Sequence, residues 1–258
     1  TLGGSALVWL WLTQRFRLQG AVRGWYQPAR LQRLVHIGYP AAVEQFVIQA
    51  GFIVFLMLIG NYYGTEAFAA YNVGVNVLLV AITVGFGFAI ASSTLVGQHL
   101  GARDPTAAAR AGWRSLGYAV LAMAGIGAVT MAFARPLILF FIDDPVTVEL
   151  SVRFIYLLGV MMPFMAVDFA IGGALRGAGD TRFPLVATMV SLIGARCGLA
   201  LLATILEMPV VWVYACLMAD YLVKAAMLTW RFQRGRWKTL LPTAAGSATP
   251  ATESTAES

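Results

Sequence analysis

Five ionisable side chains lie inside stretches that are otherwise apolar over the length of a membrane span: Glu44, Asp168, Arg196, Asp220 and Lys224. A charged group in hydrocarbon is costly unless it is paired or reached by water, so each is a candidate functional residue. Glu44 and Asp168 have no basic partner within their own stretches. Such a carboxylate must either take up a proton or hold a cation. This chemistry indicates proton or cation relay.

The other three groups have candidate partners. Asp220 and Lys224 are four residues apart, close enough on one helix to neutralise each other, and we expect them to form a structural charge pair. Arg196 leaves two interpretations open. It either pairs across helices with Asp168 or Glu44, or lies beside a water-filled cavity.

Two sets of uncharged polar side chains are further candidates for the lining of a cavity. On a helix, Glu44, Gln45 and Gln49 would cover an arc of about 140°, which is too wide for a lipid-facing surface. On the next apolar stretch Asn72, Asn76 and Thr83 fall within about 40° of one another. The alternative is that these groups hydrogen-bond between helices and hold them together.

The composition indicates that the solvent of this chain is a membrane. Hydrophobic residues make up 59% of the 258 residues and charged residues only 12%, and the mean hydropathy is +0.75. Soluble domains carry about 25% charged residues. A soluble chain of this length could not bury so much apolar side chain, so we expect an all-α integral membrane protein.

Other chemistries have little support. Cys197 and Cys216 lie in separate apolar runs and are most simply packing residues. His36 and His99 lack the spacing of metal ligands. The sequence has no nucleophile elbow, P-loop or HExxH motif. We therefore expect no enzyme activity, no metal site and no cofactor.

Apolar periodicity divides the chain into spans and connectors. Residues 1–14 read as the end of a preceding transmembrane helix, and 15–35 as a basic cytoplasmic connector. Residues 36–232 form a six-helix transmembrane lobe, and 233–258 a cytoplasmic, mostly disordered tail. The six expected spans are 36–60, 70–96, 115–134, 150–175, 183–206 and 209–231.

The distribution of basic residues predicts the orientation. Fourteen fall on one side of the spans and two, Arg135 and Arg153, on the other. By the positive-inside rule the side with fourteen is cytoplasmic, and the net charge of +6 reports topology and gives no reason to expect a nucleic-acid partner. The fourteen are Arg15, Arg17, Arg23, Arg30, Arg33, Arg103, Arg110, Arg114, Arg176, Arg182, Arg231, Arg234, Arg236 and Lys238.

A short loop joins the fourth span to the fifth. Gly177 and Gly179 allow a tight turn, and Asp180 can cap the following helix. Arg176 and Arg182 would hold this end at the cytoplasmic surface.

Three segments resemble multidrug and toxic compound extrusion (MATE) transporters. GALRGAGDTRFP (173–184) resembles the signature after their tenth helix, and GYPAAVEQF (38–46) resembles the start of their seventh. The segment 85–113 is similar to the end of their eighth helix and the loop beyond it. Arg196 also stands where the family usually has an arginine.

The resemblance implies a twelve-helix transporter of two six-helix lobes, of which this chain is the C-terminal lobe plus the end of helix six. Its partners would be the missing N-terminal lobe, membrane lipids and an organic cation or other amphiphile, exported from a bacterial inner membrane against H⁺ or Na⁺. Glu44 matches the acidic coupling residue of the seventh helix. Asp168 stands about a turn later than the aspartate that many members carry in the tenth.

Two other functions stay open. One is a lipid-linked-precursor flippase of the related superfamily, which usually needs a basic cavity for pyrophosphate. The other is a non-transporting membrane scaffold.

Overall fold

The computed structural model describes residues 28–140 and 144–239. Every regular element in these two ranges is a helix, which confirms the all-α prediction. The expected end of a preceding helix (1–14) and most of the expected tail (240–258) lie outside the described residues.

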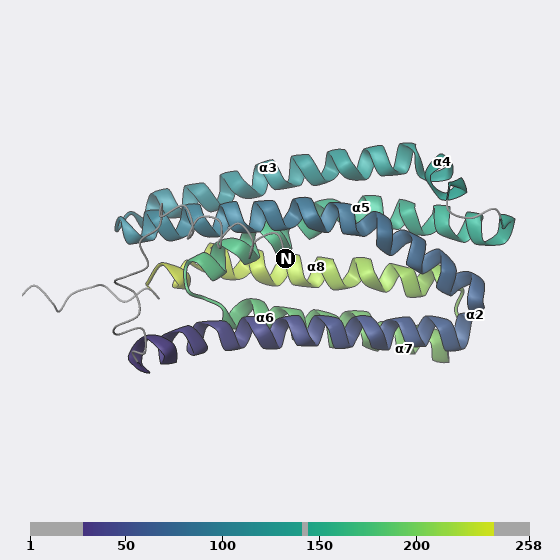
Figure 1. Ribbon diagram of the computed structural model, residues 1–258, viewed down its shortest axis with the longest axis horizontal. Coiled ribbons are helices and arrows are strands. Elements are labelled where there is room, and N and C mark those ends of the chain that lie inside the picture. The colour runs from purple at the N-terminus through teal and green to yellow at the C-terminus, as the bar shows by residue number, and fades with distance from the viewer. Residues whose placement is uncertain (1–27, 141–143, 240–258) are drawn as a thin grey trace, which may run out of the picture. The chain divides into compact units, whose positions relative to one another are not determined.

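The first helix, α2 (Pro28–Gly101), contains two predicted spans. Gly64 interrupts it with φ 84° and ψ −179°, a conformation open to glycine because it lacks a Cβ. Residues 40–63 and 65–101, called here the first and second limbs of α2, run in opposite directions from this point (Figure 1). The sequence predicted a loop between these spans, whereas the reversal takes place at one residue.

Two aspartates cap the N-termini of the next long helices. Asp104 precedes α3 (Pro105–Ala132) and accepts hydrogen bonds from the backbone N–H groups of Thr106 and Ala107. Asp144 caps α5 (Pro145–Gly177) through the N–H of Thr147. The hydroxyl groups of Thr106 and Thr147 also donate to these carboxylates, which lowers the pKa of each aspartate. The short helix α4 (Ala134–Leu139) lies in the connector between them.

The fifth span changes its helical geometry along its length. It runs through α6 (Arg182–Met189), a nine-residue π-helix η2 (Val190–Gly198) and α7 (Leu199–Ile205). Wider π-helical turns inside α-helices frequently occur at functional sites. In this span the π-helix carries Ser191 and Arg196, both buried.

The last span, α8 (Val210–Arg234), ends at Gly235, which has the left-handed conformation common after helix C-termini. A 3₁₀ turn follows, η3 (Arg236–Thr239), in which Trp237 is fully buried and stacks on Phe232 with ring centroids 4.7 Å apart. Residues 28–35 of the expected connector are helical, and residues 236–239 near the start of the expected tail are folded.

Five helices in the described ranges are long and apolar enough to cross a membrane. The first of them, Gly38–Gly101 within α2, contributes two spans because it reverses at Gly64. The chain is an integral membrane protein on these grounds, with large apolar side chains exposed on most of its helices.

The most buried span is α5, which packs against α3, α8 and the second limb of α2. A Cβ at Gly173 would collide with the carbonyl oxygen of Ala89, and one at Gly177 with that of Ser93. Small residues four apart allow this close approach of two helix backbones. The contact aligns α5 with the limb that forms one wall of the cavity described next.

Candidate functional site

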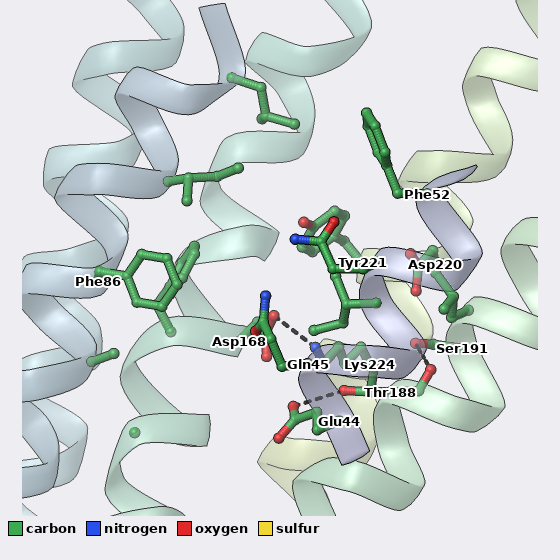
Figure 2. A pocket seen from close by; sticks show the side chains of 18 of the residues that line it. Glu44, Gln45, Phe52, Phe86, Asp168, Thr188, Ser191, Asp220, Tyr221 and Lys224 are labelled. Carbon is green, nitrogen blue, oxygen red and sulfur yellow. Dashed lines mark hydrogen bonds and ion pairs between the residues drawn. The ribbon is translucent and has the colours of Figure 1, made fainter. Parts of the chain in front are cut away.

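A cavity of about 780 Å³ lies among both limbs of α2, α5, η2 and α8 (Figure 2). Its walls are mainly apolar and aromatic, with Phe52, Phe86 and Phe169 among them. Six charged side chains also line it: Glu44, Asp168, Arg176, Arg196, Asp220 and Lys224. All five charged residues expected within the spans are thus brought to one cavity, together with Arg176.

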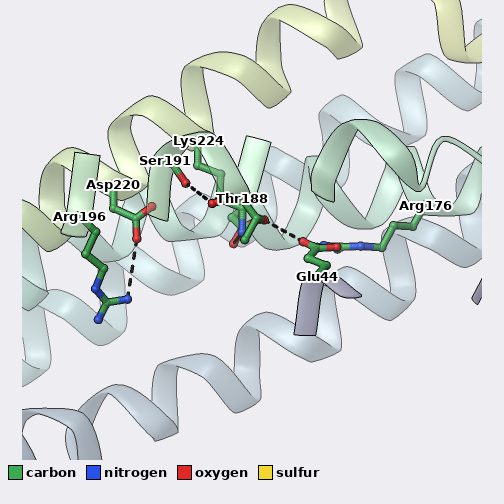
Figure 3. A network of polar contacts seen from close by, with 8 residues as sticks. Glu44, Arg176, Thr188, Ser191, Arg196, Asp220 and Lys224 are labelled. Atoms are coloured by element: carbon green, nitrogen blue, oxygen red, sulfur yellow. Dashed lines mark hydrogen bonds and ion pairs between the residues drawn. The ribbon is translucent and has the colours of Figure 1, made fainter. Parts of the chain in front are cut away.

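Glu44 on the first limb of α2 is buried, its side chain 5% exposed. Its Oε1 accepts hydrogen bonds from Arg176 Nη2 at 2.7 Å and from the hydroxyl of Thr188 at 2.9 Å (Figure 3). The carboxylate was expected to lack a partner on its own helix, and both partners come from other helices. Arg176 therefore reaches into the cavity from the end of α5, where the sequence suggested a role at the membrane surface.

Asp168 and Lys224 form a pair between α5 and α8. Lys224 Nζ donates to Asp168 Oδ2 at 2.9 Å, and both side chains are less than 15% exposed. The predicted pair of Asp220 with Lys224 is not the one that the structure contains. Four-residue spacing permits that pair, but the flexible stem of a lysine also reaches a neighbouring helix, where Asp168 would otherwise be buried without a cation.

Arg196 is the partner of Asp220. Its Nη1 lies 3.8 Å from Asp220 Oδ2, and its Nη2 donates to the hydroxyl oxygen of Tyr71 at 3.1 Å. The guanidinium also lies over the ring of Phe55, 4.8 Å from its centroid, a favourable cation–π arrangement. Arg196 therefore lines the cavity, as one of the two interpretations held. It pairs with Asp220, and not with Asp168 or Glu44 as the other interpretation held.

The three acids and three bases that line the cavity give it a formal charge of zero. Each acid is held by a base from a different element, so α2, α5, η2 and α8 are joined by ion pairs. Carboxylates buried in this way are available to an outside cation only after their internal partner moves or is outcompeted.

The uncharged candidates divide between two faces. Gln45 and Gln49 line the cavity, whereas Asn72, Asn76 and Thr83 are not part of its lining. Each of these three donates to the carbonyl oxygen four residues earlier on α2. Helical periodicity predicts that they share a face, but not which face meets the cavity, and local hydrogen bonds satisfy them where they are.

Residues of the loop after α5 make packing contacts with neighbouring helices, in addition to the tight turn that its glycines predicted. Gly179 has φ 84° and supplies the turn, while Gly177 is a site of close helix contact. Asp180 accepts a hydrogen bond from Arg231 Nε at 2.7 Å and a longer one, 3.4 Å, from the N–H of Phe183. The aspartate thus joins this loop to α8 and makes one long contact with the first turn of α6, whose N-cap position is Thr181. The remaining residue of the loop motif, Arg182, is exposed.

Sequence reasoning missed several lining residues, among them Tyr71, Thr188, Ser191 and Tyr221. These polar groups are scattered through apolar spans, with no spacing that marks them. Arg176 could have been found, because Asp168, Gly172 and Arg176 stand four residues apart on one helix face. A Cβ at Gly172 would lie 3.3 Å from Arg176 Nη1 and 3.5 Å from Asp168 Oδ1. The described residues contain no cluster of three or more histidine, cysteine or acidic side chains suited to a metal.

The structure is that of a helical integral membrane protein built around a charge-balanced cavity. The MatE family model matches residues 40–215, and the chain belongs to this family. The resemblance found in the sequence is thereby confirmed.

Relatives and solved structures agree with this assignment. The chain is 29% identical over 213 residues to a probable multidrug resistance protein NorM of Thermotoga maritima, covering 80% of this chain and 45% of the relative. It is 34% identical over 195 residues to the multidrug resistance protein NorM of Burkholderia vietnamiensis, covering 72% and 41%. The chain thus spans less than half the length of these relatives.

Among solved structures, the fold is similar to the MATE transporter ClbM in complex with Rb⁺, with a TM-score of 0.75 at 20% identity over 86% of this chain and 52% of that one. It is also similar to the eukaryotic MATE transporter AtDTX14, with a TM-score of 0.70 at 20% identity over 80% and 47%.

Proposed function

We propose that this chain is the C-terminal lobe of a secondary transporter that exports organic cations or other amphiphilic compounds in exchange for H⁺ or Na⁺. The observation that carries the proposal is the cavity of about 780 Å³, which combines aromatic walls with buried carboxylates. The multidrug resistance proteins among its relatives support the same class of activity.

The cavity suits an amphiphilic cation on two grounds. Phe52, Phe86 and Phe169 offer apolar surface and aromatic faces, to which organic cations bind favourably. Glu44 and Asp168 supply negative charge at the same surface. A flippase for pyrophosphate-linked lipids would need free basic groups, whereas each lining base here is held by an acid. The observations therefore favour cation export over this alternative and over a scaffold.

In the proposed exchange, the coupling ion and the substrate compete with internal cations. Protonation of Asp168 would neutralise the carboxylate and release the ammonium of Lys224, and a bound Na⁺ would have to displace it. Glu44 would exchange its contact with Arg176 in the same way. Ion occupancy and substrate occupancy would then exclude each other, which is the condition for antiport.

The rest of the proposed transporter lies outside this chain. A second lobe, preceding this one, would complete the pathway. The strongly basic ends of the spans would face the cytoplasm of a bacterial cell with the C-terminus on that side, and we propose no catalytic step.

The test is transport by the full-length protein in proteoliposomes under an imposed H⁺ or Na⁺ gradient, with tetraphenylphosphonium as the probe. Glu44→Gln keeps the size of the side chain but removes its titration, and we expect ion-driven efflux to fall to the level of protein-free liposomes. Glu66→Gln is the matched control, because Glu66 is exposed and does not line the cavity, and it should transport normally. Wild-type efflux by Glu44→Gln would refute the coupling role.

A further inference from the structure

A second cavity, of about 480 Å³, lies between the second limb of α2 and the start of α3, away from the charge-balanced cavity. Its lining contains Leu95 and His99 from α2, and Arg110, Arg114, Ser115 and Tyr118 from α3, with two alanines. The lining therefore includes two permanent positive charges and an imidazole, but no acid.

The lining residues form two facing stripes. Arg110, Arg114 and Tyr118 follow one another at four-residue intervals on α3, as do Leu95 and His99 on α2. At 1.5 Å per residue, Arg110 and Tyr118 are about 12 Å apart along the helix axis. Since α3 begins at Pro105 and α2 ends at Gly101, the arginines lie near the ends of the spans, and Tyr118 and Leu95 lie further into them. The cavity is thus basic at the membrane boundary and more apolar towards the membrane interior.

The two arginines differ from those of the first cavity because they lack a salt bridge within residues 28–140 and 144–239. The acid closest in sequence, Asp104, attracts Arg110 at longer range, but its Oδ1 already accepts three hydrogen bonds from the start of α3. Both arginines are exposed. Two guanidinium groups are therefore available to an outside anion.

We propose that this cavity binds the headgroup of an anionic phospholipid. The phosphate would lie between Arg110 and Arg114, with His99 opposite, since guanidinium groups donate paired hydrogen bonds to phosphate oxygens. An acyl chain would follow Leu95 and the ring of Tyr118 into the membrane. Basic pockets between transmembrane helices are suited to acidic lipids. The apolar end distinguishes a lipid from a soluble phosphate, and the absence of a lining carboxylate distinguishes the site from one for a cationic substrate.

The test is retention of phosphatidylglycerol by the full-length protein during purification from mixed phosphatidylglycerol–phosphatidylcholine membranes, measured by native mass spectrometry. We expect the wild type to retain phosphatidylglycerol over phosphatidylcholine, and Arg110→Gln/Arg114→Gln to lose this preference. The control Arg103→Gln/Arg234→Gln removes the same charge from exposed positions outside the cavity and should retain the lipid. Equal loss in both double variants would show non-specific attraction and overturn the site.

Two further measurements keep the result unambiguous. The melting temperature in phosphatidylcholine alone should be the same for both double variants, so that loss of lipid cannot be assigned to unfolding. Glycerol phosphate at millimolar concentration should not displace the lipid, and complete displacement would identify a soluble phosphate site instead. Neither outcome depends on transport, so the proposal stands or fails separately from the proposed function.

Discussion

The side chain of Lys224 shows how a charge in the cavity is neutralised by a residue of a neighbouring helix. The ammonium lies 2.9 Å from Asp168 on the neighbouring helix, and both groups are nearly withdrawn from solvent. A buried pair of this kind contributes little net stability, because desolvation offsets attraction, but removing one partner leaves the other charge buried alone. The pair is therefore sensitive to single substitutions and tolerant of double ones.

Lys224→Gln alone should destabilise the full-length protein by about 3–5 kcal/mol, since it leaves Asp168 without its cation. Lys224→Gln/Asp168→Asn removes both charges and should recover most of this loss. A double-mutant cycle on thermal unfolding in detergent measures the coupling. Additive effects of the two substitutions would show that the pair does not exist in the folded protein.

For single residues, the sequence indicated which charged side chains line the cavity, but it did not indicate their ion-pair partners. Charges inside apolar spans identified Glu44, Asp168 and Arg196 as candidate functional residues, and all three line the cavity. The partner of each lies on another helix, for example 132 residues away along the chain for Glu44 and Arg176. Spacing along the chain predicts neighbours on one helix only, which is why the pair of Asp220 with Lys224 was expected.

Among the elements, α5 depends on its glycines for its place beside α2. Gly173 and Gly177 bring its backbone against Ala89 and Ser93, and no side chain fits between. The sequence suggested a turn at Gly177, because a glycine at a helix end usually supplies one. Only the position of the neighbouring helix reveals its packing role.

Gly173→Ala should destabilise the lobe by about 1–3 kcal/mol, because the added methyl group forces two helix backbones apart. Gly117→Ala on α3 is the control, since its new Cβ meets no atom within 4 Å. Alanine there should be neutral or stabilise the helix by about 0.5–1 kcal/mol. Thermal unfolding of both variants in detergent compares them. Equal stability would contradict the close contact between α5 and α2.

The spans themselves were largely predictable, and their local irregularities were not. Hydropathy predicted the third span at 115–134, whereas α3 begins earlier, at Pro105. The reversal at Gly64 and the π-helix η2 have no hydropathy signal, because both segments remain apolar throughout. Such features arise from packing against neighbouring helices.

For the molecule as a whole, the charge distribution predicts its orientation in the membrane. Ala102 lies in the turn between α2 and α3, and Val146 lies at the start of α5, after the connector that follows α3. Both positions are exposed. In a background lacking Cys197 and Cys216, Ala102→Cys should react with impermeant maleimide only after the cells are opened. Val146→Cys should react in intact cells, and the reverse pattern would contradict the positive-inside assignment.

The proposed exchange requires that the carboxylates of the cavity bind the coupling ion and the substrate in competition. The most direct measurement is the dissociation constant of tetraphenylphosphonium from the full-length protein, over a series of pH values and Na⁺ concentrations. We predict weaker binding as H⁺ or Na⁺ rises, and a flat dependence in Glu44→Gln/Asp168→Asn, with Glu66→Gln like the wild type. Binding that ignores both ions in the wild type, or that keeps its full ion dependence without the two carboxylates, would contradict the account.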